Sequence, residues 1–513
     1  MYHHRKDADF GAKCGKKLYD LAPKSAFFAI FTKNMEMELS DTLVGRRQQI
    51  ETLDSIMESR EAEFVVVYGR RRVGKTFLVN AYFNDEYAFK LTGLAQKGKS
   101  DQLANFKISL NRYGEGKYSK PRSWLDAFEQ LRTLLEKKKA STGKRVIFID
   151  ELPWMDTRGS KLITALEHFW NDWACTQPDI VLIVCGSATS WITKKILKNR
   201  GGLHNRVTQK IYLNPFNLAE CKEYLGSRGI VMDDKSITEC YMIMGGIPYY
   251  LKQIKKGKSL AQNVDEMFFL DKGSLDGEFD ALYSSLFTQS EGYIKVVEAL
   301  SSKKKGLTRG ELLEAVKANS NGHFSTIMKN LVDCEFVRCY KGYGKTSKMS
   351  LYQLIDPFTL FYFKYIKKYG TSDKPFWQYQ TDTRTHDTWA GLAFEQLCLN
   401  HHLQIEKGLG ISGITTKVFS WTGGTDEKAQ IDLLIKRKDG ILNVCEMKYY
   451  DGEYAMGKKE KDEIERRVRI FKEVNNPKEA IHPVLVTTYG LRSNEFSNIF
   501  QRIITLKDLF QQR

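Results

Sequence analysis

The sequence of 513 residues lacks several features that mark secreted, zinc-binding or membrane proteins. Its nine cysteines are an odd number and form no CxxC pair, a pattern that disfavours a disulfide framework and a zinc site and favours a reducing compartment. The longest apolar runs, such as residues 180–188, fall short of the roughly 18 residues that a membrane-spanning helix needs. The N-terminus has no apolar segment of the kind found in signal peptides. We therefore expect a cytoplasmic protein with free thiols and no membrane span.

Acidic residues are also in deficit. Aspartate and glutamate total 62 against 79 lysines and arginines, which gives a formal net charge of +17. A positive surplus of this size suits a polyanion, either nucleic acid or an anionic membrane surface, and charge alone does not choose between them. The hydrophobic content of 42% is enough to build several buried cores, so the length predicts three or four domains.

The chain divides into segments with different patterns. Residues 1–38 show no sustained periodicity, so we interpret them as an N-terminal arm or extension, with Met35 or Met37 as a candidate native start. From residue 39, helical stretches alternate with short apolar strands, which is typical of an α/β fold with a parallel sheet. The predicted strands span residues 63–69, 145–151, 179–187 and 210–216. Helical spacing then continues to about residue 270.

Residues 69–76, "GRRRVGKT", fit the phosphate-loop pattern G-x-x-x-x-G-K-S/T and lie between a predicted strand and a predicted helix. In that context, backbone N–H groups and the helix N-terminus surround the phosphates, Lys75 reaches the β and γ oxygens, and Thr76 offers its hydroxyl to Mg²⁺. The predicted nucleotide-binding residues are Gly69, Arg70, Arg71, Arg72, Val73, Gly74, Lys75, Thr76 and Phe77. The loop predicts a bound nucleotide with Mg²⁺.

The segment "RVIFIDE" supplies a second part of such a site. Its apolar strand delivers Asp150 to the Mg²⁺ shell, and the adjacent Glu151 is placed to orient an attacking water. An Asp-Glu pair at the end of a strand is weak evidence alone. Combined with the phosphate loop, it predicts hydrolysis as well as binding.

Five segments together resemble the archaeal-type P-loop ATPases, relatives of the AAA+ and STAND groups, over residues 40 to 260. They are "VGRRQQIETL", "GRRRVGKT", "FIDELPW", "CGSATSWI" and "GGIPYYL". The resemblance implies ATP as the nucleotide, an ATPase core over residues 39–215 and a helical lid over residues 216–285.

The resemblance also implies roles for single residues, each with a simpler alternative. Ser187 matches the sensor of the γ-phosphate, although a serine there also caps a helix. Arg206 lies where such families place an arginine finger, but it could equally be a solvated loop residue, and Arg200 competes for the role. The remaining matches are adenine contacts, for which the lid positions could instead be a plain helix break: Val44, Gly246 and Pro248.

Residues 286–370 predict a winged helix, because helical stretches precede a basic hairpin that bears tyrosines. Thr308 is expected to cap the second helix with Glu311 in a capping box. Such a fold lays its third helix in the major groove of DNA, and the hairpin lysines would reach phosphates: Lys341, Lys345 and Lys348. A protein contact or a merely solvated hairpin is the alternative.

Residues 371–513 read as a mixed α/β domain. The strand at residues 441–448 places Glu446 and Lys448 on the face that also carries Val444. Asp432 lies on the preceding strand, and the hairpin brings both carboxylates within reach of one Mg²⁺, with Lys448 placed to stabilise phosphate charge. Glu395, on a predicted helix, adds a third oxygen ligand. A structural salt bridge is the alternative.

The order Glu395, Asp432, Glu446-x-Lys448 resembles the PD-(D/E)XK nucleases over residues 385–490, in particular the restriction-endonuclease-like domain fused to archaeal-type ATPases. Ile431 stands where that motif has proline, with Gln430 before it. We interpret His401 and His402 as surface residues because no third ligand accompanies them.

The leading hypothesis is an ATP-hydrolysing switch or motor coupled to an Mg²⁺-dependent nuclease that acts on DNA. The rival is a regulatory or scaffolding ATPase with an inactive nuclease-like domain. A membrane-surface ATPase has only the net charge in its favour. A homo-oligomer is expected if Arg206 acts on a neighbouring subunit.

Overall fold

The computed structural model describes residues 43–138, 143–187, 189–199, 201–287, 289–344, 350–423 and 427–512. The predicted arm at residues 1–38 lies outside these ranges, as do Arg200, Lys345 and Lys348. The chain forms two units, Met1–Val44 and Gly45–Arg513, and all the helices and strands named below belong to the second. The cysteines in the described ranges are free thiols, as predicted. None of the helices in these ranges is long and apolar enough to cross a membrane.

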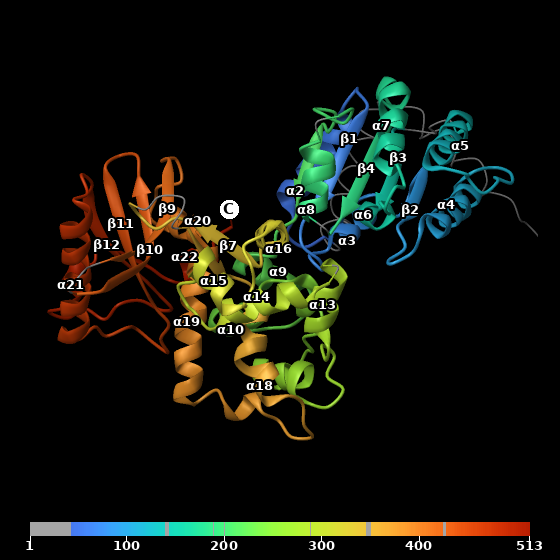
Figure 1. The fold of residues 1–513 in the computed structure, drawn as a ribbon. Helices are drawn as coiled ribbons and strands as arrows, with labels where there is room; N and C mark the ends of the chain where they lie inside the picture. The colour runs from blue at the N-terminus through green and yellow to red at the C-terminus, as the bar shows by residue number, and fades with distance from the viewer. Residues whose placement is uncertain are drawn as a thin grey trace, which may run out of the picture. The chain divides into compact units, whose positions relative to one another are not determined.

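The N-terminal part of the second unit is built on a five-stranded parallel sheet with the order β2-β3-β4-β1-β5 (Figure 1). Its strands are β1 (Glu63–Tyr68), β2 (Phe89–Thr92), β3 (Arg145–Asp150), β4 (Ile180–Gly186) and β5 (Gln209–Tyr212). The central strand β4, "IVLIVCG", has no charged residue and is buried along its whole length, as expected for a strand covered on both faces. The predicted α/β fold with a parallel sheet is confirmed.

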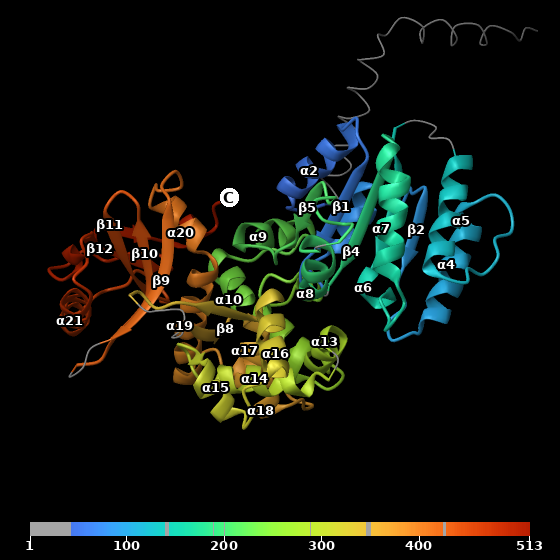
Figure 2. The same cartoon turned by 45° about the horizontal axis from the view of Figure 1, so that its top comes forward.

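Helices cover this sheet. They are α2 (Arg47–Glu58), α3 (Lys75–Tyr82), α4 (Lys99–Tyr113), α5 (Trp124–Lys137), α6 (Leu152–Met155), α7 (Leu162–Asp172) and α8 (Thr189–Ile192). Helix α5 shows why the sequence folds this way, because Trp124, Phe128, Leu131 and Leu135 recur at helical spacing and are all buried. Helices α4 and α5 lie at the β2 edge of the sheet (Figures 1 and 2).

A helical segment follows the sheet, as predicted. It contains α9 (Leu218–Ser227), α10 (Asp234–Met244), α11 (Pro248–Leu251), α12 (Leu260–Val264) and the π-helix η3 (Asp265–Phe269). Asn217 begins α9 with a capping box, since its side chain accepts from the Glu220 N–H and the Glu220 carboxylate accepts from the Asn217 N–H. We call residues 216–285 the lid.

The next segment, which we call the middle module, has the order helix, strand, helix, helix, strand, strand. Its elements are α14 (Glu291–Ser301), β6 (Leu307–Thr308), α15 (Arg309–Ala315), α16 (Gly322–Asp333), β7 (Val337–Tyr340) and β8 (Leu351–Leu354), preceded by α13 (Glu278–Leu286) and followed by α17 (Pro357–Phe361), η5 (Tyr362–Ile366) and α18 (Lys367–Tyr369). The strands form an antiparallel sheet with the order β6-β8-β7. The predicted capping box at Thr308 and Glu311 is confirmed.

The C-terminal part carries a second five-stranded sheet with the order β13-β12-β11-β10-β9. Its elements are η6 (Trp377–Tyr379), α19 (Arg384–Asn400), α20 (His402–Gly408), β9 (Thr416–Gly423), β10 (Ala429–Arg437), β11 (Ile441–Lys448), α21 (Lys458–Asn475), β12 (Ala480–Thr487), η7 (Ser497–Ile499), β13 (Arg502–Ile504) and α22 (Leu506–Leu509). Helix α21 packs on β9 and β10, whereas α19 packs on β11 (Figures 1 and 2). The predicted β10–β11 hairpin is present and antiparallel.

The prediction that His401 is a surface residue is wrong. The His401 side chain is buried, its Nδ1 donates to the Leu397 carbonyl at 2.9 Å, and its Nε2 accepts from the Leu218 N–H at 3.3 Å. Its ring also packs edge-on against Tyr241. The error arose because the lid helices α9 and α10, distant in sequence, cover this end of α19.

Candidate functional site

The phosphate loop between β1 and α3 depends on two glycines. Gly69 has a φ of +146°, and a Cβ there would lie 2.3 Å from the Leu213 carbonyl oxygen. Gly74 has a φ of +90° and precedes the first residue of α3, Lys75. Side chains other than hydrogen are strained at both positions, so the two motif glycines follow from the backbone path itself.

The polar residues of the loop meet the end of β3. Lys75 is buried, and its Nζ donates to the Arg70 carbonyl oxygen at 2.8 Å. Thr76 donates from Oγ1 to Asp150 Oδ2 at 2.9 Å. A hydroxyl and a carboxylate oxygen at the start of a helix and the end of a strand are the donor set that Mg²⁺ prefers beside a nucleotide phosphate.

Glu151 and Ser187 are in direct contact. The Ser187 hydroxyl lies 2.9 Å from both carboxylate oxygens of Glu151, and the Ser187 N–H donates to the same carboxylate at 3.3 Å. Burial raises the pKa of Glu151, while the charge of Lys75 and the bonds from Ser187 act in the opposite direction. The structure therefore brings together two residues from the loop, Lys75 and Thr76, two from the end of β3, Asp150 and Glu151, and Ser187 from the end of β4.

The other predicted nucleotide residues are placed as follows. Phe77 on α3 has a side chain that is 58% exposed, which leaves its ring open to a ligand. Arg206 is exposed in the turn before β5. Val44 is the last residue of the first unit, and its role as an adenine contact stays a prediction.

The lid motif has the geometry of a helix break. Gly245 ends α10 with a φ of +69°, and Pro248 begins α11. Gly246 has a φ of +66° and its carbonyl accepts from the Phe216 N–H at 2.8 Å; a Cβ there would lie 2.1 Å from the Phe216 carbonyl oxygen. The simpler alternative for Gly246 and Pro248 is thus realised, and an adenine contact stays a prediction.

The side chains of two loop arginines form ion pairs with residues outside the loop. Arg70 pairs with Asp356 at 2.8 Å, both side chains being buried, and its guanidinium lies over the Phe336 ring. Arg72 pairs with Glu278 at 2.5 Å. The guanidinium groups of both arginines are therefore neutralised by acidic partners outside the loop. The sequence analysis missed both acidic partners, Asp356 and Glu278. The local sequence feature that could have pointed to Asp356 is the Asp-Pro pair at residues 356–357, which is typical of a helix start.

A further arginine, Arg46, also contacts the phosphate loop, and the sequence analysis did not single it out. It is buried, and its guanidinium donates to the Asn214 carbonyl at 2.7 Å and to the Val73 carbonyl at 3.0 Å. It also lies over the Phe216 ring. Arg46 thus connects the phosphate loop with the segment that leads into the lid. The sequence feature that could have pointed to Arg46 is the motif "VGRR", which also bears arginines.

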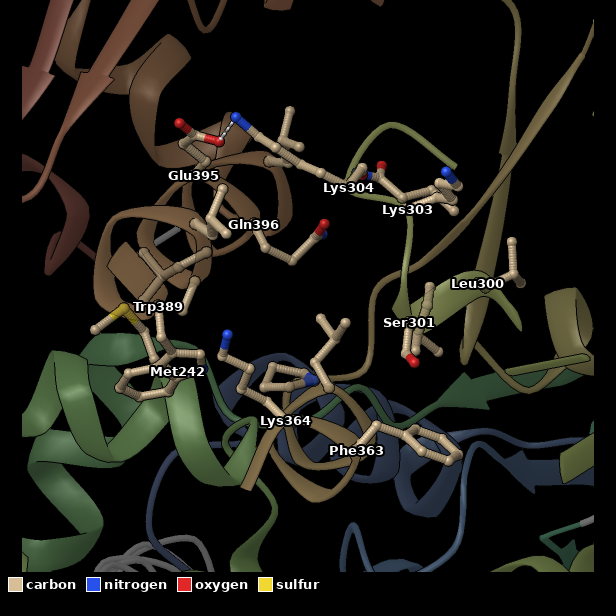
Figure 3. A pocket seen from close by; sticks show the side chains of 18 of the residues that line it. Met242, Leu300, Ser301, Lys303, Lys304, Phe363, Lys364, Trp389, Glu395 and Gln396 are labelled. Carbon is tan, nitrogen blue, oxygen red and sulfur yellow. Dashed lines mark hydrogen bonds and ion pairs between the residues drawn. The ribbon is translucent and has the colours of Figure 1, made fainter. Parts of the chain in front are cut away.

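A second polar centre lies where the middle module meets the C-terminal sheet. Lys304, between α14 and β6, forms an ion pair with Glu395 of α19 (Figure 3). Its Nζ also lies 3.4 Å from Asp432 Oδ2. Gln430 donates to the other carboxylate oxygen, Asp432 Oδ1, at 2.5 Å. Burial and the neighbouring Asp432 charge raise the pKa of Glu395 to about 7, against the pull of Lys304. A shift in the β9–β10 register falls between Ile431 and Leu434, next to Asp432.

Glu446 on β11 has two basic partners. Lys448 Nζ lies 2.9 Å from Glu446 Oε1, and Arg467 of α21 lies 2.9 Å from Glu446 Oε2. Val444 belongs to the apolar cluster that contains Ile470 of α21, which agrees with the predicted common face. The salt bridge considered as the alternative is therefore present.

Within the described ranges, no three histidine, cysteine, aspartate or glutamate side chains are arranged so that they could hold one metal ion. The predicted ligands fit Mg²⁺ in chemistry, since Glu395, Asp432 and Glu446 all offer carboxylate oxygens. In the structure, lysine and arginine side chains neutralise these carboxylates. The cation between Glu395 and Asp432 is the ammonium of Lys304.

A cavity of about 500 Å³ adjoins this centre. It is lined by residues of α10, the middle module and α19, among them Met242, Phe363, Lys364 and Trp389 (Figure 3). Lys304 and Asp432 line this cavity and also a shallower depression that contains Lys428, Arg466 and Arg467.

Comparison with known proteins concerns the part of the chain that carries the phosphate loop. Residues 43–254 match the model of an ATPase domain that occurs predominantly in Archaea. An uncharacterized protein of Methanocaldococcus jannaschii is 24% identical over 413 residues, which cover 80% of this chain and 88% of that protein. The chain therefore contains an archaeal-type ATPase domain.

Solved structures that resemble the chain include a Walker-type ATPase of Pyrococcus abyssi, with a TM-score of 0.46 and 16% identity over 63% of this chain and 96% of the other. The ORC2 protein of Aeropyrum pernix, solved with ADPNP and ADP, has a TM-score of 0.39 and 13% identity over 63% of this chain and 93% of the other.

Proposed function

We propose that the ATPase domain binds ATP with Mg²⁺ and hydrolyses it at the meeting point of the phosphate loop, β3 and β4. The observation that carries this proposal is the contact of Thr76 with Asp150 at 2.9 Å, beside a buried Lys75 and a Glu151 held by Ser187. Phosphate binding needs the Lys75 ammonium to leave the Arg70 carbonyl and turn to the β and γ oxygens. Mg²⁺ held by Thr76 and Asp150 would neutralise charge on the phosphates.

Glu151 is the residue that we assign to the attacking water. In the structure its carboxylate accepts from the Ser187 hydroxyl, and we propose that this hydroxyl turns away when the carboxylate orients water. Ser187 then becomes available to the γ-phosphate, which supports the sensor role. We therefore interpret the Glu151–Ser187 contact as the resting arrangement of the site.

The test of ATPase activity is phosphate release by the full chain. Lys75→Ala should abolish hydrolysis and strongly weaken binding of a fluorescent ATP analogue, because the buried ammonium is the main charge facing the phosphates. Lys97→Ala, an exposed lysine on the same domain, is the matched control and should behave as the wild type. Hydrolysis by Lys75→Ala at the wild-type rate would overturn the proposal.

We infer a second activity for the C-terminal domain, Mg²⁺-dependent cleavage of DNA. It is supported by the convergence of Glu395 and Asp432 on one cation and by Lys448 beside Glu446. The net charge of +17 and the basic depression over Arg466 and Arg467 suit a phosphate backbone. The middle module has the element order of a winged helix, so α16 and the segment carrying Lys341 are the parts that we propose for DNA contact.

The rival proposal, a regulatory ATPase whose nuclease-like domain is inactive, is favoured by the neutralised carboxylates. It is also supported by the contacts of Phe336 and Asp356 with Arg70, through which this part of the chain packs on the phosphate loop. A plasmid-cleavage assay with Mg²⁺, with and without ATP, separates the two. Asp432→Asn should abolish cleavage, whereas Asp439→Asn, in an exposed turn of the same hairpin, should not. Absence of Mg²⁺-dependent cleavage by the wild type in both conditions would favour the rival.

A further inference from the structure

The ammonium of Lys304 occupies the space between two carboxylates of another part of the chain. It forms an ion pair with Glu395 and lies 3.4 Å from Asp432 Oδ2. The two carboxylates come from different elements, Glu395 from α19 and Asp432 from β10, and both face the one ammonium. Figure 3 shows Lys304 pointing at Glu395, whereas the neighbouring Lys303 points away.

The loop that carries Lys304 is held by the middle module. The Lys304 carbonyl accepts from Gln353 Nε2 at 2.6 Å, and the Lys305 carbonyl accepts from the Tyr340 hydroxyl at 2.6 Å. Gly306 has a φ of +82°, and a Cβ there would lie 2.2 Å from the Tyr352 carbonyl oxygen. Strands β7 and β8 therefore set the position of Lys304 with respect to the carboxylates.

We propose that Lys304 is a built-in competitor of the metal ion, which keeps the C-terminal centre closed until the loop of the middle module withdraws. This inference rests on the proposed nuclease site. A divalent cation bound to the same two carboxylates would lie within about 4 Å of the ammonium, where like charges repel strongly in a partly buried site. Metal and ammonium therefore exclude each other.

The same segment that holds the loop contacts the phosphate loop of the ATPase domain. Gln353 donates to the Lys304 carbonyl, and Asp356, which caps the N-terminus of α17, pairs with Arg70. The short run between these two residues thus connects the nucleotide site to the Lys304 loop by contacts within one unit. A movement of the Arg70 backbone on nucleotide binding would therefore be transmitted to Lys304 through Asp356 and Gln353.

The same contacts would also be present in an ordinary interface salt bridge. The experiment must therefore measure metal binding. Mn²⁺ is titrated, with electron paramagnetic resonance as the readout of free Mn²⁺, into the nucleotide-free full chain of five proteins. They are the wild type, Lys304→Gln, Lys304→Arg, Lys303→Gln and the double variant Lys304→Gln/Asp432→Asn. Any Mn²⁺ held by Thr76 and Asp150 is common to all five proteins and cancels in the comparison. Melting curves in EDTA verify that each variant folds.

Removal of the competitor should tighten Mn²⁺ binding by about tenfold in Lys304→Gln, the value expected for the loss of two partly exposed ion pairs. Lys303→Gln should match the wild type, and the gain should disappear in the double variant. Lys304→Arg, which keeps the charge, should stay at the wild-type affinity. Equal Mn²⁺ affinity in Lys304→Gln and the wild type would overturn the inference, and so would a gain that survives Asp432→Asn.

DNA cleavage by the same proteins separates this inference from the nuclease proposal. Tighter Mn²⁺ binding by Lys304→Gln without cleavage by any variant would refute the nuclease and retain the competitor. Mg²⁺-dependent cleavage by the wild type, with Mn²⁺ affinity unchanged in Lys304→Gln, would refute the competitor and retain the nuclease.

Discussion

Asp356→Asn should strongly destabilise the contact between the phosphate loop and the middle module. Asp356 has no exposed side-chain surface, and Arg70 is 4% exposed, so the substitution leaves an uncompensated buried guanidinium. Asparagine can still cap α17, because a side-chain oxygen remains to accept from the Thr359 N–H, which now donates at 2.9 Å. The loss is therefore electrostatic, and removing one partner of a buried ion pair costs about 3–5 kcal/mol of unfolding free energy.

Urea unfolding followed by tryptophan fluorescence measures this cost. The control is Asp85→Asn, which breaks the ion pair of Lys90 with a carboxylate that is 66% exposed, and should cost less than about 1 kcal/mol. The apolar double replacement Arg70→Met/Asp356→Leu should recover most of the loss, because it removes both buried charges. A cost for Asp356→Asn no larger than that of the Asp85 control would refute the reasoning.

Three further predictions concern the two sites. Thr76→Ala should raise the Mg²⁺ concentration needed for half-maximal ATP hydrolysis, because one of two oxygen donors is lost; an unchanged Mg²⁺ dependence would contradict this role. Mixing Arg206→Ala subunits into the wild type should lower hydrolysis more than dilution does if Arg206 acts on a neighbouring subunit, and a linear decrease would point to a monomeric switch. Lys448→Ala should change the unfolding free energy by less than about 1 kcal/mol, since Lys448 is 37% exposed and Glu446 keeps Arg467; a larger loss would mean a structural role for Lys448.

Local patterns predicted much of the ATPase domain. Strands β1, β3, β4 and β5 were predicted because each is a short apolar run. The loop glycines were predicted because the backbone path of the phosphate loop fixes their spacing. Strand β2 was missed, since Phe89–Thr92 has only four residues and ends in an exposed threonine. The C-terminal hairpin was predicted from the alternation of side chains along its strands.

The partners of the site residues could not be predicted in the same way. Lys304 lies far from Glu395 and Asp432 in sequence, and Asp356 lies far from Arg70, so no window of local sequence contains both members of a pair. The same reason accounts for His401, which is covered by a lid helix that precedes it in the chain. Chain topology, which brings these segments together, carries information that residue patterns lack.

The most direct test of the nucleotide site is the fate of ATP on Glu151→Gln. The substitution keeps the shape of the side chain but removes the charge that is assigned to the attacking water, while Lys75, Thr76 and Asp150 remain in place. The variant should therefore retain one ATP per chain with its γ-phosphate intact, under conditions in which the wild type releases phosphate. Phosphate release by Glu151→Gln at the wild-type rate, or loss of ATP binding equal to that of Lys75→Ala, would contradict the account.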